Sequence, residues 1–204
     1  VFVGLPKSSS LTTEESVFRA SGFGRVTAAG GGGNDRAYLA DSAEDDIFVG
    51  NPSSSYLKSD NYFNAVRDFS FVSARASAGG YDTAQLIDSP GDDVFYGTPE
   101  FALLRNNVHQ NRVAGFDRVL ARSFGGEDIA TFRDSSGDDI FVSSPTQSYL
   151  HDRANYFIEA RRFSRVTAYA SEGNDRAIAR GSSGDDRFVS SPNMSFMRGD
   201  GYFN

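Results

Sequence analysis

Short apolar and polar segments alternate along the whole chain, and their order repeats at a fixed interval. A phenylalanine recurs every 46 or 47 residues, and a proline follows each one four residues later. The phenylalanines are Phe2, Phe48, Phe95, Phe141 and Phe188, and the prolines are Pro6, Pro52, Pro99, Pro145 and Pro192. An interval of this size, kept from copy to copy, indicates a tandem array in which each repeat is one structural unit.

Two segments of each repeat alternate with period two. In the second copy Val72, Ala74 and Ala76 occupy alternate positions, and Ala84 and Leu86 do so after an intervening glycine turn. A period of two is typical of β-strands, because successive side chains of a strand point to opposite faces. Candidate helical windows are too short, and they coincide with expected strands in other copies. The sequence therefore predicts an all-β protein.

Further apolar residues keep the same phase in every copy. An apolar residue lies nine positions after each phenylalanine, and a second phenylalanine lies 21 or 22 positions after it. The first set is Leu11, Leu57, Leu104, Leu150 and Met197, and the second set is Phe23, Phe69, Phe116 and Phe163. We expect these residues, with the alternating valines, leucines and alanines, to form the core.

These features predict a parallel β-solenoid (β-helix) of about 4.4 tandem repeats. The chain is expected to be one array over residues 1–204, with repeats at approximately 1–46, 47–93, 94–139 and 140–186 and a partial copy at 187–204. A repeat of 46–47 residues is too long for one typical coil, so two coils per repeat are expected. The alternative is a set of antiparallel strands in each repeat, as in a propeller blade or a small sandwich.

Glycine- and aspartate-rich turns, such as Gly32 to Asp35 and Asp45 to Phe48, carry a resemblance to a known family. They resemble the calcium-binding β-roll repeats of the repeats-in-toxin proteins, although the aspartates here are 11 residues apart instead of nine. The whole repeat also looks like the long tandem arrays of giant secreted or surface proteins of bacteria, planctomycetes in particular. This second resemblance implies a role at the cell surface or in a matrix.

Two aspartates in each repeat end acidic turns and are the candidate metal ligands. They are Asp35, Asp46, Asp82, Asp93, Asp128, Asp139, Asp175 and Asp186. Calcium prefers several oxygen ligands, and stacked turns would bring carboxylates, carbonyls and serine or asparagine oxygens into register. The alternative is that each aspartate caps a turn by accepting backbone N–H groups. Arg36, Arg75, Arg122 and Arg176 are expected to neutralise the aspartate columns.

Charge and repetition exclude several classes of function. A net charge of −7 disfavours nucleic acid as a partner, and no apolar run is long enough to span a membrane. A catalytic site needs a single constellation, whereas here each carboxylate pair recurs in every copy, so we expect no enzyme. The two histidines, His109 and His151, are expected on the surface.

The sequence therefore predicts a structural repeat protein that forms a rod or filament of the cell surface or matrix. Its expected partners are copies of itself stacked end to end or a longer parent chain, because neither end carries an atypical capping repeat. The alternative is a calcium-dependent adhesin that binds surface glycans through exposed tyrosines. The candidate tyrosines are Tyr56, Tyr62, Tyr149, Tyr156 and Tyr202.

Overall fold

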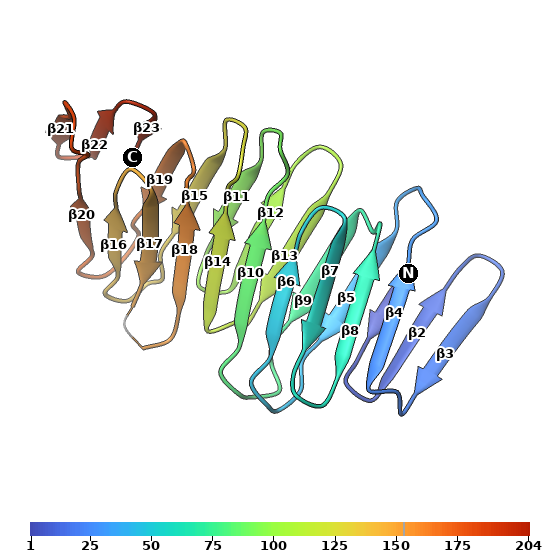
Figure 1. The fold of residues 1–204 in the computed structure, drawn as a ribbon. Helices are drawn as coiled ribbons and strands as arrows, with labels where there is room; N and C mark the ends of the chain where they lie inside the picture. Colours follow the sequence, from blue (N-terminus) through green and yellow to red (C-terminus); the bar gives the residue numbers. More distant parts are fainter. Residues whose placement is uncertain (153) are drawn as a thin grey trace.

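The computed structural model describes residues 1–152 and 154–204, which form strands joined by turns and contain no helix (Figure 1). The strands are β1 (Phe2–Gly4), β2 (Ser8–Thr12), β3 (Val17–Ser21), β4 (Arg25–Ala29), β5 (Arg36–Ala40), β6 (Ile47–Gly50), β7 (Ser54–Lys58), β8 (Phe63–Arg67), β9 (Phe71–Arg75), β10 (Thr83–Ile87), β11 (Val94–Gly97), β12 (Phe101–Arg105), β13 (Gln110–Ala114), β14 (Arg118–Arg122), β15 (Ile129–Arg133), β16 (Ile140–Ser143), β17 (Gln147–His151), β18 (Phe157–Arg161), β19 (Arg165–Tyr169), β20 (Arg176–Ala179), β21 (Arg187–Ser191), β22 (Met194–Gly199) and β23 (Tyr202–Phe203).

The strands form two sheets that face each other along the whole length of the protein (Figure 1). One sheet has the order β21-β22-β23-β19-β15-β11-β12-β13-β9-β5-β1-β2-β3, and the other has the order β20-β16-β17-β18-β14-β10-β6-β7-β8-β4. The chain passes from one sheet to the other and back, and the strands of successive coils pair in parallel. The predicted β-solenoid is confirmed, with about six turns.

Each repeat begins with three consecutive antiparallel strands that stay in one sheet. We call these groups meanders; they are β1–β3, β6–β8, β11–β13, β16–β18 and β21–β23. The apolar residue nine positions after each phenylalanine pairs with it across the first hairpin, as Leu57 pairs with Phe48 and Leu104 with Phe95. The antiparallel strands of the alternative interpretation therefore exist, but inside a solenoid.

The expectation of two coils per repeat is wrong. A meander crosses the molecule once, and the two single strands that follow it cross once each, so a repeat makes three crossings, or one and a half turns. Successive meanders therefore lie in alternate sheets, and each repeat is related to the next by a half-turn. Two repeats place five strands in each sheet, so at ~4.8 Å per strand one repeat advances the rod by roughly 12 Å.

The phenylalanine columns form the core between the sheets. Phe48 and Phe95 are fully buried, and each packs against the second phenylalanine of the next repeat. The ring centroids of Phe48 and Phe116 are 6.3 Å apart, and those of Phe95 and Phe163 are 5.9 Å apart. In the outermost coils of the chain no neighbouring coil covers these columns, and Phe23 is 65% exposed and Phe188 55% exposed.

Two hydrogen-bonded polar pairs are buried in the core where neighbouring meanders face each other. Ser55 donates to Asn111 Oδ1 (3.1 Å), and Asn111 Nδ2 donates to the carbonyl of Asn51 (3.3 Å). Ser9 and Asn64 form the same pair in the first repeat. In the third repeat the two positions hold Ala102 and Ile158, so an apolar pair replaces the polar one without leaving either partner unsatisfied.

The glycine turns allow adjacent coils to approach closely. Gly126 has a φ of 98°, and a Cβ there would lie 2.4 Å from the carbonyl oxygen of Gly91 in the preceding coil. A Cβ at Gly80 would likewise lie close to the carbonyl oxygen of Glu44, and a Cβ at Gly173 close to that of Gly137. A side chain at these positions would therefore clash with the neighbouring coil and would also strain the backbone.

We expect Phe95→Ala to reduce the free energy of unfolding by about 3 to 5 kcal/mol, because a fully buried ring is lost and its cavity cannot close. Chemical denaturation measures the change. Phe188→Ala is the matched control: the same substitution at the same repeat position, but on an exposed ring, should cost less than about 1 kcal/mol. Equal costs for the two variants would contradict the core assignment.

A second prediction concerns the buried polar pair. Ser55→Ala and Asn111→Ile should each cost about 1 to 3 kcal/mol, because each leaves a buried polar group without its partner. The double variant reproduces the Ala102 and Ile158 pair and should recover most of that loss. A double-mutant cycle by denaturant unfolding tests this; costs that simply add would show that the two side chains are not coupled.

Candidate metal site at the stacked aspartate turns

The residues that directly precede the core strands, or that begin the strand in the case of β23, are stacked in two columns, one at each end of the coils. Their order follows from the strand order of the sheets. We call them the first and second turn columns; the first contains Gly24, Tyr62, Asp46, Asp82, Asp117, Tyr156, Asp139 and Asp175, and the second contains Asp35, Ser70, His109, Asp93, Asp128, Ser164, Tyr202 and Asp186.

The two aspartates of a repeat do not meet. Asp35 lies in the second column and Asp46 in the first, with strand β5 between them, which is roughly 17 Å long. Contacts instead join aspartates 35 or 36 residues apart. The eight predicted ligands are therefore divided equally between the two ends of the coils.

Backbone N–H groups of one coil donate to aspartate carboxylates of the next. Asp46 N donates to Asp82 Oδ1 (2.8 Å), and Asp82 N donates to Asp117 Oδ2 (2.7 Å). Asp93 N donates to Asp128 Oδ1 (2.7 Å), and Asp139 N to Asp175 Oδ1 (3.0 Å). These bonds give the carboxylates the capping role that was the alternative to calcium, while the calcium role stays a prediction.

Tyrosines bridge the column where a meander interrupts it. The hydroxyl of Tyr62 donates to Asp46 Oδ1 (2.5 Å), and Tyr156 and Tyr202 donate in the same way to Asp139 and Asp186. Burial and the bond to Asp46 raise the pKa of Tyr62 above its ordinary value. The expectation that Tyr62, Tyr156 and Tyr202 are exposed is therefore wrong, because their rings are buried and their hydroxyls are bonded inside the turns.

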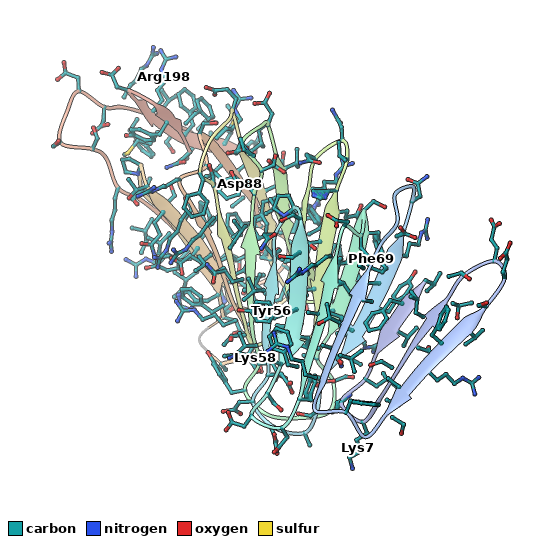
Figure 2. All side chains as sticks on the ribbon, turned by 45° about the vertical axis from the view of Figure 1, so that its right-hand side comes forward. Lys7, Tyr56, Lys58, Phe69, Asp88 and Arg198 are labelled. Atoms are coloured by element: carbon teal, nitrogen blue, oxygen red, sulfur yellow. The ribbon has the colours of Figure 1, made fainter. Side chains whose placement is uncertain are left out.

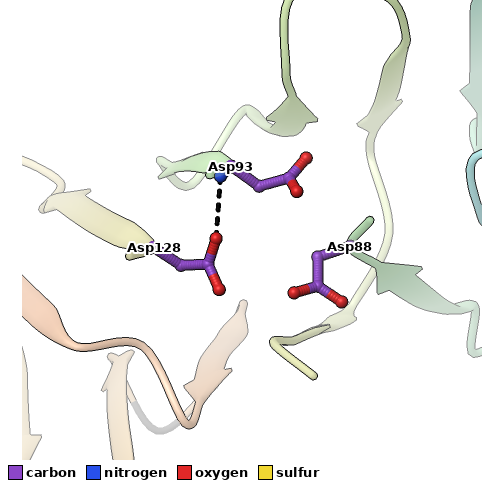
Figure 3. Close-up of side chains that lie close together, drawn as sticks. All are labelled: Asp88, Asp93 and Asp128. Atoms are coloured by element: carbon purple, nitrogen blue, oxygen red, sulfur yellow. Dashed lines mark hydrogen bonds between the residues drawn. The ribbon is translucent and has the colours of Figure 1, made fainter. Parts of the chain in front are cut away.

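A third aspartate lies beside the column in three of the four acidic turns. It precedes the second predicted aspartate by five residues and is Asp41, Asp88 or Asp134. Asp88, Asp93 and Asp128 have carboxylate oxygens within 4.8 Å of one another, and Asp134, Asp139 and Asp175 form a second such group. Figure 3 shows the first group, with the three carboxylates around a common space. Sequence analysis missed Asp88 and Asp134 as candidate ligands, although their repeated place in the turn was visible.

The group of Asp88, Asp93 and Asp128 is more deeply buried than the group of Asp134, Asp139 and Asp175. All three of its aspartates are buried, and Asp88 is 6% exposed. Asp128 accepts from the hydroxyl of Ser123 (2.6 Å), and Asp93 Oδ2 from that of Ser89 (2.6 Å). Burial raises the pKa of Asp88 to about 6, and the charges of Asp128 and Asp93 act in the same direction. Burial also raises the pKa of Asp128.

His109 occupies the column position that tyrosine holds in the second, fourth and fifth meanders. It lies 16 residues after Asp93, as Tyr62 does after Asp46. Its Nε2 atom is buried and has no hydrogen-bond partner. Burial lowers the pKa of His109, whereas the charge of Asp93 acts in the opposite direction. The expectation of a surface histidine is therefore only partly correct for His109, which is half-buried with its Nε2 atom covered.

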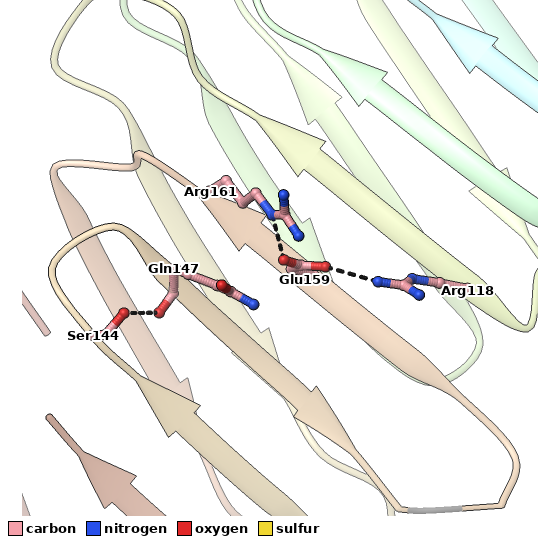
Figure 4. Close-up of polar contacts among 5 residues, drawn as sticks. All are labelled: Arg118, Ser144, Gln147, Glu159 and Arg161. Atoms are coloured by element: carbon pink, nitrogen blue, oxygen red, sulfur yellow. Dashed lines mark hydrogen bonds and ion pairs between the residues drawn. The ribbon is translucent and has the colours of Figure 1, made fainter.

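The arginines do not neutralise the aspartates as expected. In the described part of the chain Arg36, Arg75, Arg122 and Arg176 form no ion pair, and Arg36 lies over the ring of Phe71. The ion pairs of the described residues lie instead on the outer face of a sheet, where Arg118 (3.2 Å) and Arg161 flank the fully buried carboxylate of Glu159 (Figure 4). The turn columns therefore receive no cation from these side chains.

No family model, curated protein or solved structure matches this chain. The resemblance to calcium-binding and surface arrays thus remains an expectation drawn from the repeat itself. The described residues form no helix that is long and apolar enough to cross a membrane. The turn columns are the part of the molecule where buried ionisable groups collect, and they are the candidate site.

The raised pKa values of Asp82 and Asp88, both about 6, predict a pH dependence. In the unfolded chain these groups titrate near pH 4, so between about pH 4 and 6 the folded state binds more protons. Their contribution to stability is then greatest below about pH 4 and is lost as the pH rises through 6. We expect the Tm, measured in chelator, to rise as the pH falls from 7 to 5.

Asp88→Asn tests whether the carboxylate of Asp88 causes this pH dependence. It keeps an oxygen that can accept from the N–H of Phe124 but removes the charge. Its Tm should exceed that of the unchanged protein at pH 7, and its pH dependence should be weaker. An unchanged slope would mean that Asp88 does not titrate in this range.

Proposed function

We propose that this chain is a structural module of an extracellular or cell-surface repeat array, in which stacked coils form a rod. The observation that carries the proposal is the continuity of the two sheets. Strands from every repeat enter the same two hydrogen-bonded ladders, and the same turn columns and core columns recur from coil to coil. In such a solenoid each repeat contacts only its neighbours, so length can be added without redesigning the fold.

The sheet edges support continuation of the rod by further coils. Strands β3 and β4 lie at one edge, and β20 and β21 at the other. Core-facing rings are exposed there, with Phe18 at 60% beside Phe23 at one edge. Unpaired edge strands with apolar side chains are templates for pairing with another strand. We propose that further coils of the same repeat cover them, supplied by a longer chain or by a second copy.

Sedimentation velocity and negative-stain imaging over a concentration series test this proposal. We expect concentration-dependent association into rods whose length exceeds that of one chain. Phe18→Lys places a charge in the core column at the edge and should abolish association. Val108→Lys is the matched control, because Val108 is also exposed but lies in a hairpin turn. Monomers at all concentrations, or equal behaviour of both variants, would refute association through the edges.

The same samples test the predicted calcium role. A lower Tm and shorter rods in chelator, restored by calcium, would assign calcium to the aspartate turns. An unchanged Tm with intact rods would leave the carboxylates as turn caps.

A glycan-binding adhesin is the second candidate, and the aromatic stacks on the outer face favour it. Tyr56 stacks on Phe63 at 5.2 Å between ring centroids, and Tyr149 stacks on Phe157 at 5.3 Å. Figure 2 shows Tyr56 among the side chains of its sheet. Both tyrosines are half-buried, so one ring face is used within the protein. Binding to a glycan array that is lost in Tyr56→Ala and Tyr149→Ala would support this candidate over the structural one.

A further inference from the structure

The two signs of charge occupy different parts of this molecule. Of the 27 aspartates and glutamates, only Glu159 lies in one of the described strands, and the others lie outside them. Arginines, by contrast, alternate with core residues inside the strands, so that their side chains point outward. The net charge of −7 is therefore the sum of cationic sheet faces and anionic coil ends.

The outer face of the larger sheet, which runs from β21 to β3, carries positive charge alone (Figure 1). In the described strands of this sheet there is no aspartate or glutamate, and its arginines form no ion pair. In the smaller sheet Glu159 pairs with Arg118 and Arg161. We call the outer surface of the larger sheet the arginine face; its arginines are Arg19, Arg36, Arg75, Arg105, Arg112, Arg133, Arg165, Arg187 and Arg198.

Three of these arginines lie in one row at equal intervals. The register of the strand pairs places Arg36 of β5, Arg105 of β12 and Arg165 of β19 level with one another across the sheet. Two strands separate each arginine from the next, so at ~4.8 Å per strand each interval is roughly 14 Å. The three residues come from different positions of the repeat, so the 46–47-residue interval alone does not produce the row.

Aromatic rings order the guanidinium groups of this face. Four arginines lie over a ring of a neighbouring strand, with 4.8 to 5.7 Å between the guanidinium carbon and the ring centroid; the pairs are Arg36–Phe71, Arg112–Phe101, Arg133–Tyr169 and Arg165–Phe203. A guanidinium stacked on a ring keeps its N–H edge free for a second partner. Because the side chain is already ordered, binding costs less conformational entropy.

The spacing of the row favours a polyanion of low charge density. Guanidinium groups bind carboxylates through two parallel N–H···O bonds. Duplex DNA carries one charge per ~1.7 Å, which is far denser than the row, and a chain of net charge −7 repels it at long range.

Neutral residues fill the intervals of the row, and their aromatic and aliphatic groups suit the apolar faces of sugar rings. They are Phe71 and Gln110 in the first interval and Val94 and Ile129 in the second. An acidic polysaccharide has the matching pattern, because its carboxylates are separated by neutral parts of the sugar rings.

We propose that the arginine face binds a linear polysaccharide that carries carboxylate groups and lies along the rod. Its carboxylates bind Arg36, Arg105 and Arg165, and its sugar rings cover the residues between them. The proposal does not depend on end-to-end assembly, because the face is open in a single chain. It is also separate from the tyrosine stacks, because Tyr56 and Tyr149 lie in the other sheet.

Isothermal titration with an oligogalacturonate tests the proposal. The oligomer should be at least as long as the row, which spans six strand intervals or roughly 29 Å. We expect affinity to fall at least about tenfold between 50 and 200 mM salt, as counterion release from about three contacts implies. Neutral dextran of equal size should not bind. Absence of oligogalacturonate binding at low salt, or equal binding of dextran, would overturn the proposal.

Two other occupants of the face are distinguished by the same measurements. Tighter binding of single-stranded DNA of equal length would assign the face to nucleic acid. Salt-sensitive association of the chain with itself, without oligogalacturonate binding, would assign it to the acidic turns of a second copy. Either result would overturn the proposal.

Replacement of the three row arginines together, as Arg36→Gln, Arg105→Gln and Arg165→Gln, is the decisive variant. All three side chains are exposed, so the protein should fold normally, which circular dichroism checks. We expect affinity for oligogalacturonate to fall at least about tenfold, at roughly two- to threefold for each exposed contact. Lysine at the same three positions keeps the charges and should restore part of the affinity.

The matched control removes three charges from the other sheet, as Arg25→Gln, Arg67→Gln and Arg176→Gln. These arginines are also exposed and lie in strands, so both triple variants have the same net charge. The control should bind oligogalacturonate within about twofold of the unchanged protein, since it leaves every proposed contact in place. Equal losses in the two variants would show that binding follows net charge and not the row, and would overturn the proposal.

Discussion

The odd number of crossings in each repeat determines most of what is specific about this solenoid. A three-stranded meander remains in one sheet and therefore counts as a single crossing, so that the repeat closes after one and a half turns. Residues that meet in space are consequently not those at the same position of adjacent repeats. Phe48 packs against Phe116, and Ser55 bonds to Asn111, across intervals that are neither one repeat nor two. Two successive coils never present the same type of turn to each other.

This arrangement explains the mixed composition of the turn columns. Three kinds of turn follow one another in each column, and a meander adds a fourth position where its last strand begins. An aspartate suits the positions where it accepts an N–H from the neighbouring coil. A tyrosine suits the meander position, because its hydroxyl can span the additional distance to the aspartate beyond the hairpin. The buried acidic residues are therefore part of the stacking mechanism and not an addition to a finished fold.

Sequence patterns revealed the strands and the core but not the pairing of strands. Period two in Val72, Ala74 and Ala76 is a local property, and it identifies the face that is buried. The partner of a strand depends on how coils stack, which no local period specifies. The nine-residue interval from Phe48 to Leu57 suits a coil corner as well as a hairpin, and the coil count depended on that choice. The turn bonds are likewise long-range: Asp93 meets Asp128, and neither residue marks the other in the sequence.

The contrast between two kinds of substitution shows why His109 stands out. Where Ala102 and Ile158 replace serine and asparagine, both partners change, so that neither polar side chain of the pair remains without the other. At the turn of Asp88, the residues His109 and Phe124 stand at the positions from which a tyrosine and a serine donate to carboxylates one repeat later, and neither residue makes the corresponding bond. The array thus contains one pair of substitutions that removes both hydrogen-bonding partners and another pair that removes only the donors, on the same backbone. Since a solenoid repeat interacts only with its neighbours, the unpaired charge cannot be relieved from elsewhere in the chain. Relief has to come from protonation of the carboxylates or from a bound cation.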